Sequence, residues 1–493
     1  MLNKSTVALY LIFALCVFAL CLYISFNNPV TSDGASLFLE AKDMADGNIL
    51  LRGWTLSTVS FYFTEAIWYT IVIRIFGDSI YLMYVLPAVF YTITIMLVFA
   101  LSHTDGKMKW SIAALIPCVI ISSPMASTMT LGTCVHVGTI IFALVCLNML
   151  RCDKHTIAKL ACVTTLTVAS VFSDSIFNYY ITIPIVVTFV VHLLINKDFS
   201  KWRYVFAVIV GVVIAKFLTL VANYFGLLNT PGTQPPAFVS YENIPSNLNL
   251  FIVGIIQYFD AFIFGKQFSV SNAMIFSRFA VMIFWLALLV VAIKKRFKAS
   301  FVDTALSISS VLLPVAYVAS NMPVDLDTTR YLVFSFITGS ALIARYLNSQ
   351  AEQRLYAFAS TIILIFIFIP SGRYELPNSR VQDISKFVRD NNLGDGYGTF
   401  WVASAVTLFK NGDVRPITFT DENKAVRLNW LSNKAWYGFK SRYIVTEFKH
   451  DIDKILNQYG REGHIKEIDN AYIIYYDDAR YSQETTQCGR LFI

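Results

Sequence analysis

Long apolar runs constrain this chain more than any other feature. Eleven runs of roughly 16 to 23 residues fill most of the first 370 residues, at 7–26, 79–101, 110–127, 130–150, 156–173, 177–195, 204–226, 275–293, 300–319, 331–347 and 355–370. A helix of about 20 apolar residues crosses the hydrocarbon core of a bilayer. Only 14% of the 493 residues are charged, against about 25% in soluble domains. The sequence therefore predicts a polytopic α-helical membrane protein with about 11 transmembrane helices, and it excludes a soluble enzyme, a disordered chain and a coiled coil.

Charged residues are distributed unevenly along the chain. Residues 1–370 contain 22 Lys and Arg and 16 Asp and Glu, whereas residues 371–493 contain 17 and 16. A polar segment of that length can bury a core of its own. We therefore expect a transmembrane domain at 1–370 and a separate domain at 371–493. The net charge of +7 lies mostly in short loops between apolar runs, so it does not indicate nucleic-acid binding.

Helical and strand-like patterns alternate in the C-terminal domain. Helices are predicted at 379–391, 402–410 and 451–459, and strands at 392–401 (after a turn), 414–420, 442–448 and 465–476. This alternation predicts an α/β domain. The glycines at 394, 396 and 398 lack the spacing of a dinucleotide loop, and neither CxxC nor HExxH occurs in the sequence. We therefore expect neither a cofactor nor a bound metal.

Basic residues mark alternate loops between the apolar runs. The marked loops carry Lys107 and Lys109; Arg151, Lys154 and Lys159; Lys197, Lys201 and Arg203; Lys294, Lys295, Arg296 and Lys298; and Arg345 and Arg354. Lys and Arg accumulate on the cytoplasmic side of a membrane. The N-terminus is therefore expected in the cytoplasm, and an odd number of spans makes the C-terminal domain extracytoplasmic.

Two shorter apolar stretches, 61–76 and 251–264, are expected to lie in the outer interface without crossing the membrane. The first carries Glu65 and Arg74, and the second carries Asp260. If either stretch crossed, every later loop would change sides and several basic loops would face outward.

The two largest outer loops are then 27–78 and 227–274. Four prolines fall within residues 230–249 of the second loop. Proline removes a backbone donor and interrupts a helix interior, so no helix is expected there.

The first outer loop begins with a predicted amphipathic helix at 32–47. Ser32 or Asp33 can cap its N-terminus and Gly47 can end it. Its apolar residues form one stripe, which is typical of a helix lying on a membrane surface.

The carboxylates of this helix lie near the face opposite the stripe. A carboxylate held above the bilayer can act as a general base on an acceptor hydroxyl. Asp33 is the best candidate because it lies where the first span meets the helix, and Glu40 is the next. Asp43 and Asp46 are expected to face solvent. The alternative is a capped interfacial helix whose acids are simply solvated.

Arg330 and Tyr331 open a late span on the predicted outer side. An arginine at a membrane boundary can hold a phosphate. The alternatives are an interface anchor or an ion-pair partner of Asp325 or Asp327. Arg278, at the outer end of another span, is either a second phosphate contact or an anchor.

Three further residues are candidates for substrate binding. Lys216 lies in the middle of a span, where a charge is costly, so it marks either a functional site or a buried ion pair. His136, near the outer end of the run 130–150, is either a site residue or a packing residue. Trp54 could stack on a sugar ring or belong to an aromatic belt.

These residues resemble the pattern of the GT-C glycosyltransferases. In that superfamily an aspartate after the first span opens a juxtamembrane helix, here represented by Asp33, Phe38, Ala41 and Gly47, and an outer Arg-Tyr pair opens a late span, here Arg330 and Tyr331. The resemblance implies a polyisoprenyl-phosphate sugar donor whose phosphate Arg330 holds. It also implies that Asp33 deprotonates an acceptor hydroxyl, which attacks with inversion. An extracytoplasmic α/β domain ends many members, where it is implied to bind the acceptor or cover the site.

Length and layout are most similar to the bacterial serotype-converting O-antigen glucosyltransferases. The implied donor is undecaprenyl phosphate glucose, and the implied acceptor is a lipid-linked O-antigen glycan at the inner membrane. Members that use lipid pyrophosphates have a metal and a second outer acidic motif, and residues 122–130 contain no acid. A monophosphate donor without a metal is therefore expected. Aminoarabinose or mannose transferases would share these features.

Two other functions fit part of the pattern. A transporter or flippase of lipid-linked sugars would account for the spans and Lys216, but not for the outer domain or the acidic first loop. An O-antigen polymerase would have a large central outer loop and no outer C-terminal domain.

Overall fold

A computed structural model describes residues 4–103, 123–132, 136–151, 156–349, 379–482 and 488–489. Its α-helices are α1 (Lys4–Phe26), α2 (Ser32–Ala45), α3 (Ile67–Phe76), α4 (Leu82–Leu101), α6 (Pro124–Ser127), α7 (Val137–Leu150), α8 (Ile157–Ser173), α9 (Ile183–Asn196), α10 (Trp202–Tyr224), α11 (Ile244–Tyr258), α12 (Ala273–Arg296), α13 (Phe301–Ala319), α14 (Val333–Ser349), α16 (Ser379–Asp390), α17 (Phe400–Thr407) and α18 (Lys449–Tyr459). Shorter helical segments are η1 (Tyr62–Ala66), η3 (Thr128–Gly132), η4 (Asn178–Thr182), η5 (Val270–Asn272), η6 (Leu326–Leu332) and η8 (Lys434–Trp436).

The fold is that of a multi-pass α-helical membrane protein. Six described helices are long and apolar enough to cross a bilayer, at Val7–Phe26, Leu82–Leu101, Asn178–Ile195, Trp202–Tyr224, Val270–Arg296 and Phe301–Ala319. Nine of the eleven predicted runs are helical over most of their length in the described part of the chain, and the run 110–127 contributes only α6 at its end. The run 355–370 and most of the run 110–127 lie outside the described residues, as does the predicted domain boundary at 370, so the count of eleven stays a prediction.

The chain divides into two compact units that both draw on distant parts of the sequence. One unit consists of residues 1–25, 87–218 and 234–372. The other consists of residues 26–86, 219–233 and 373–493, which joins the first outer loop to the C-terminal domain.

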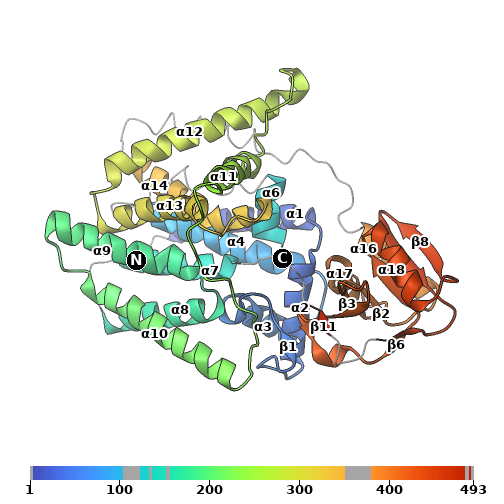
Figure 1. Ribbon diagram of the computed structural model, residues 1–493. Coiled ribbons are helices and arrows are strands. Elements are labelled where there is room, and N and C mark those ends of the chain that lie inside the picture. The colour runs from blue at the N-terminus through green and yellow to red at the C-terminus, as the bar shows by residue number, and fades with distance from the viewer. Residues whose placement is uncertain are drawn as a thin grey trace. The chain divides into compact units, whose positions relative to one another are not determined.

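The first unit is a helical bundle in which α13 lies beside α14, α9 and α11 (Figure 1). Asp303 of α13 is fully buried and pairs with Arg296 and Arg345. A buried carboxylate needs such partners because its desolvation would otherwise cost several kcal/mol. Arg345 was expected in a basic loop. It lies instead inside α14, 5% exposed, because it is this carboxylate's partner.

The C-terminal domain is built on a seven-stranded mixed sheet in the order β11-β4-β3-β2-β7-β9-β8. Its strands are β2 (Gly396–Thr399), β3 (Val414–Phe419), β4 (Ala425–Leu428), β7 (Tyr443–Thr446), β8 (His464–Ile468), β9 (Ala471–Tyr475) and β11 (Cys488–Gly489), and short pairs are formed by β1 (Trp54–Thr55) with β5 (Ser432–Asn433) and by β6 (Lys440–Ser441) with β10 (Tyr481–Ser482). The predicted α/β domain is confirmed.

The first outer loop and the C-terminal domain share main-chain and side-chain contacts. Helix α2 packs against α17 (Figure 1), and β1 pairs with β5. The Asp78 carboxylate lies 2.9 Å from Lys42 Nζ and 2.7 Å from Lys410 Nζ. The hydrogen bond from Lys410 is the main reason that the pKa of Asp78 falls to about 2.

The proline-rich stretch departs from expectation at its C-terminal end. No helix was expected within 230–249, yet α11 begins at Ile244. Pro245 lies in the first turn of α11, where a missing backbone N–H leaves no helical hydrogen bond unmade, so it is compatible with a helix start.

Candidate functional site

Helix α2 places Asp33 in its first turn. Thr31 is the N-cap, and its Oγ1 accepts a hydrogen bond from the backbone N–H of Gly34 at 3.2 Å. The prediction that Ser32 or Asp33 caps the helix is therefore wrong by one or two residues, because the Thr31 hydroxyl accepts the hydrogen bond from the Gly34 N–H. Asp33 is half-buried at the positive end of the helix macrodipole, and its Oδ1 atom is buried.

Glu40 lies two turns further along α2 in a very different setting. Its side chain is 2% exposed, and its Oε1 atom is buried without a hydrogen-bond partner among the described residues. Burial raises the pKa of Glu40 to about 8. Ser36, one turn earlier, hydrogen-bonds Ser404 of α17 at 3.0 Å. Of the two candidate bases, Asp33 is thus the one with access to solvent.

Asp43 and Trp54 form a packed cluster. The expectation that Asp43 faces solvent is wrong, because it accepts hydrogen bonds from Asn48 Nδ2 and Trp54 Nε1, both at 2.6 Å. Trp54 is 2% exposed, and its ring meets that of Trp436 edge-on at 4.6 Å. These contacts favour a packing role for Trp54 over stacking on a sugar.

Arg330 and Tyr331 lie in η6, directly before α14. Asp325 caps η6 by accepting a hydrogen bond from the backbone N–H of Thr328 at 3.1 Å. The Arg330 guanidinium lies over the Tyr331 ring, 5.4 Å from its centroid, and both side chains are half-buried. A guanidinium in such a cation–π contact still has N–H donors that can bind an anion.

His136 lies next to Tyr331, with its ring edge-to-face and the two centroids 5.7 Å apart. The imidazole Nδ1 is 2.6 Å from Oδ2 of Asp174, the residue that follows α8. His136, Tyr331 and Arg330 therefore form one row of contacts in the first unit, and Asp174 extends it.

Arg278 and Lys216 lie in different settings. Arg278 of α12 is 3% exposed and forms an ion pair with Asp260, which follows α11. This pairing favours a structural role over a second phosphate contact. Lys216 is exposed on α10, about 12 Å along the helix from its end at Tyr224, and makes no ion pair with a described residue.

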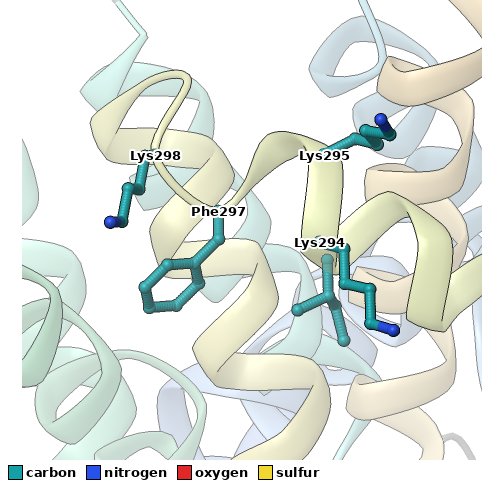
Figure 2. A pocket seen from close by; sticks show the side chains of 5 residues that line it. Lys294, Lys295, Phe297 and Lys298 are labelled. Atoms are coloured by element: carbon teal, nitrogen blue, oxygen red, sulfur yellow. The ribbon is translucent and has the colours of Figure 1, made fainter.

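A pocket of about 460 Å³ lies at the C-terminal end of α12, about 24 Å along the helix from Arg278. Figure 2 shows its lining, which consists of Ile293, Lys294, Lys295, Phe297 and Lys298. The lysines are the basic residues that indicate the cytoplasmic side, so we do not assign this pocket to the candidate site. No group of three His, Cys, Asp or Glu side chains in the described ranges could hold a metal ion.

Asp174 joins the candidate residues through its contact with His136, and the sequence analysis did not identify it. Acids were considered only at residues 122–130, whereas Asp174 directly follows the apolar run 156–173. The basic loop between the runs 130–150 and 156–173 places His136 and Asp174 at the same membrane side. This predicted topology could have identified Asp174 as an acid on the same side of the membrane as His136.

Comparisons with known proteins give a likeness of fold. No protein-family model matches this chain, and no curated protein does either. The crystal structure of ArnT from Cupriavidus metallidurans bound to undecaprenyl phosphate matches with a TM-score of 0.57 at 13% identity, covering 98% of this chain and 100% of that one. The apo state of the same protein matches with a TM-score of 0.56 at 12% identity, covering 97% and 99%. The chain thus has the fold of the ArnT structure over 98% of its length, and the predicted fold class, a multi-pass helical membrane protein with a C-terminal α/β domain, is confirmed.

Proposed function

We propose that this chain is a glycosyltransferase that takes its sugar from a polyprenyl-phosphate donor. The observation that carries the proposal is the fold shared over the full length with ArnT, whose structure holds undecaprenyl phosphate. The shared fold includes the C-terminal domain, which a transporter or flippase would not require.

In the proposed reaction, Asp33 takes the proton of an acceptor hydroxyl as the oxygen attacks the anomeric carbon. The bond between that carbon and the phosphate oxygen breaks, and polyprenyl phosphate leaves with the electron pair. Arg330 binds the phosphate through charge-assisted hydrogen bonds, which strengthen as negative charge develops. The attack comes from the face opposite the leaving group, so the anomeric configuration inverts. The position of Asp33 in the first turn of α2 and the contact between Arg330 and the Tyr331 ring support these roles.

The finer assignment is that the sugar is a hexose, glucose in the first instance, and that the acceptor is a lipid-linked O-antigen or related surface glycan. It rests on the resemblance in length and layout to the serotype-converting enzymes. The reaction would occur on the outer face of the inner membrane, with the C-terminal domain in the periplasm.

Transfer from synthetic polyprenyl-phosphate sugars to a glycan acceptor, followed in detergent, tests the reaction. We expect Asp33→Asn to lower kcat by about 10²- to 10⁴-fold, since it removes a general base but keeps the side-chain shape. Asp46→Asn is the matched control, because Asp46 is the exposed C-cap of the same helix and loses the same charge. It should retain wild-type activity.

Two results would count against the proposal. A flippase would move the lipid without forming a new glycosidic bond to any acceptor. An active Asp33→Asn enzyme would exclude Asp33 as the base. Mass spectrometry of surface polysaccharide with and without the gene tests the finer assignment, for which we expect one added hexose per repeat.

A further inference from the structure

Asp174 is a buried carboxylate that the proposed reaction does not use. It is 1% exposed, and both of its oxygens accept hydrogen bonds. Oδ2 accepts from His136 Nδ1 at 2.6 Å and from Thr139 Oγ1 at 2.8 Å, and Oδ1 accepts from the backbone N–H of Ile176 at 3.2 Å. A buried carboxylate with this many donors holds each of them in a fixed direction.

The backbone of His136 has an unusual conformation, and its side chain contacts a residue outside α7. His136 is the N-cap of α7 with φ of +66°, a left-handed conformation that non-glycine residues rarely adopt. Its side chain forms no capping hydrogen bond to α7 and contacts Asp174 instead. Such a conformation persists where surrounding contacts impose it, and it is found often at functional sites.

Three helix ends meet around this ring. Asp174 directly follows α8, His136 directly precedes α7, and the Arg330–Tyr331 pair lies in η6 before α14. The contacts run from Asp174 to His136, from the His136 ring to Tyr331, and from Tyr331 to the Arg330 guanidinium. A carboxylate thus orients an imidazole that contacts the same tyrosine ring as the arginine assigned to phosphate.

We propose that Asp174 is a positioning residue that fixes His136 as a second ligand of the donor phosphate, next to Arg330. The inference rests on the proposed function, because it assigns the phosphate of the polyprenyl carrier as the group bound. His136 makes the contact in this assignment, and Asp174 acts through it.

The chemistry follows from the two nitrogens of the imidazole ring. A carboxylate that accepts the Nδ1–H fixes the orientation of the imidazole ring, and a second hydrogen bond, from Nε2 to a phosphate oxygen, uses the second ring proton. Nε2 lies on the far side of the ring from Nδ1, so a ring held at Nδ1 presents the Nε2–H away from Asp174. A hydrogen bond from the ring to a phosphate oxygen is charge-assisted because the phosphate is ionised, and it is therefore stronger than a hydrogen bond between neutral groups.

Binding of undecaprenyl phosphate to the purified full chain, measured by native mass spectrometry or calorimetry, separates this role from turnover. We expect His136→Gln and Asp174→Asn each to weaken binding by about 10- to 100-fold, which is the loss of one charge-assisted contact. Undecaprenol, which lacks the phosphate, should bind all variants equally. Asp174→Glu should recover part of the lost affinity.

A double-mutant cycle tests whether Asp174 acts through His136. The variant carrying both His136→Gln and Asp174→Asn should bind undecaprenyl phosphate no more weakly than His136→Gln alone, because residues that act as one unit are not additive. His192→Gln is the matched control. His192 is also a buried histidine of this unit, but its Nε2 contacts Thr304 Oγ1 at 2.9 Å, so its loss should lower the melting temperature without changing phosphate affinity.

Each failure has its own signature. A wild-type chain that does not bind undecaprenyl phosphate contradicts the proposed function itself. A wild-type chain that binds, together with a folded His136→Gln variant of unchanged affinity, overturns the phosphate role of the Asp174–His136 pair and leaves the proposed function intact. If Asp174→Asn does not fold, the affinity of His136→Gln for undecaprenyl phosphate tests the inference by itself. Equal loss of undecaprenol and undecaprenyl phosphate binding would also overturn the inference.

Discussion

At the scale of single residues, helix α2 carries two carboxyl groups in opposite settings. Asp33 lies in the first turn with its carboxylate at the positive end of the helix, whereas Glu40 is buried with one oxygen lacking a partner in the described structure. A buried carboxyl group without a cation is more stable in its neutral form. We therefore expect Glu40, whose pKa is about 8, to be mostly protonated near pH 7.

The raised pKa of Glu40 predicts a pH-dependent stability that Glu40→Gln removes. The folded pKa of about 8 lies above the ordinary glutamate value, so the folded state binds the proton more tightly than the unfolded state. The contribution of Glu40 is therefore most favourable below about pH 4.5, falls by up to ~1.4 kcal/mol per pH unit as the pH rises, and levels off above pH 8. Glu40→Gln should raise the melting temperature at pH 8 and flatten its dependence between pH 5 and 8.

Asp46→Asn is again the control for this measurement, since the exposed Asp46 should leave the pH profile unchanged. Transfer activity gives an independent reading. An inactive but stable Glu40→Gln enzyme would make Glu40 the base, whereas an active one would leave that role to Asp33.

At the scale of elements, local patterns were enough to predict most helices and strands, but not the pairs that they form. The apolar runs predicted α4, α8, α10, α12 and α13 to within a few residues at each end. An apolar segment in a bilayer forms a helix because a helix satisfies its own backbone hydrogen bonds. The strands β4, β5 and β6 were missed because they have only two to four residues, too few to show alternation. The pairing of β1 with β5 joins residues nearly 380 positions apart, and no local signal encodes it. The same holds for the hydrogen bond from His136 to Asp174 and for the edge-to-face contact between Trp54 and Trp436.

Gly396 is required by packing against the neighbouring strand and not by a phosphate-binding loop. The Gly394, Gly396 and Gly398 series is no phosphate loop. A Cβ atom at position 396 would lie 2.2 Å from Cζ of the buried Tyr443 ring on the neighbouring strand β7. The glycine is needed so that this ring can lie flat on β2. Tyr443 in turn donates a hydrogen bond to the Gly394 carbonyl oxygen at 3.2 Å.

Gly396→Ala should therefore destabilise the C-terminal domain by about 1–3 kcal/mol through overpacking. Thermal unfolding of the full chain measures the effect. The control is a cycle with Tyr443→Leu, which removes the ring. If the contact is the cause, Gly396→Ala should cost much less in the Tyr443→Leu background. An equal cost in both backgrounds would mean that the backbone, and not the ring, requires the glycine.

At the scale of the whole molecule, the basic residues predict one orientation in the membrane. The Lys294, Lys295 and Lys298 cluster ends α12, and the three side chains are exposed at that end (Figure 2). Positive charge of this kind favours the cytoplasmic side. If the end of α12 is cytoplasmic and the C-terminal domain is extracytoplasmic, an odd number of spans must lie between them. An experiment can test whether this number is odd without counting the helices.

Single cysteines at Lys298 and Lys466 test that orientation, because both side chains are exposed and lie in the basic end of α12 and in strand β8. In spheroplasts, a membrane-impermeant maleimide should label Lys466→Cys without permeabilisation and should label Lys298→Cys only after it. Labelling of the parent chain, which has eight cysteines, is subtracted as the blank. If both positions react before permeabilisation, the number of crossings between them is even and a span has been miscounted. If only Lys298→Cys reacts, the membrane orientation is inverted. Asp33 would then face the cytoplasm and could not act on an extracytoplasmic glycan, so this outcome would contradict the proposed site as well as the topology.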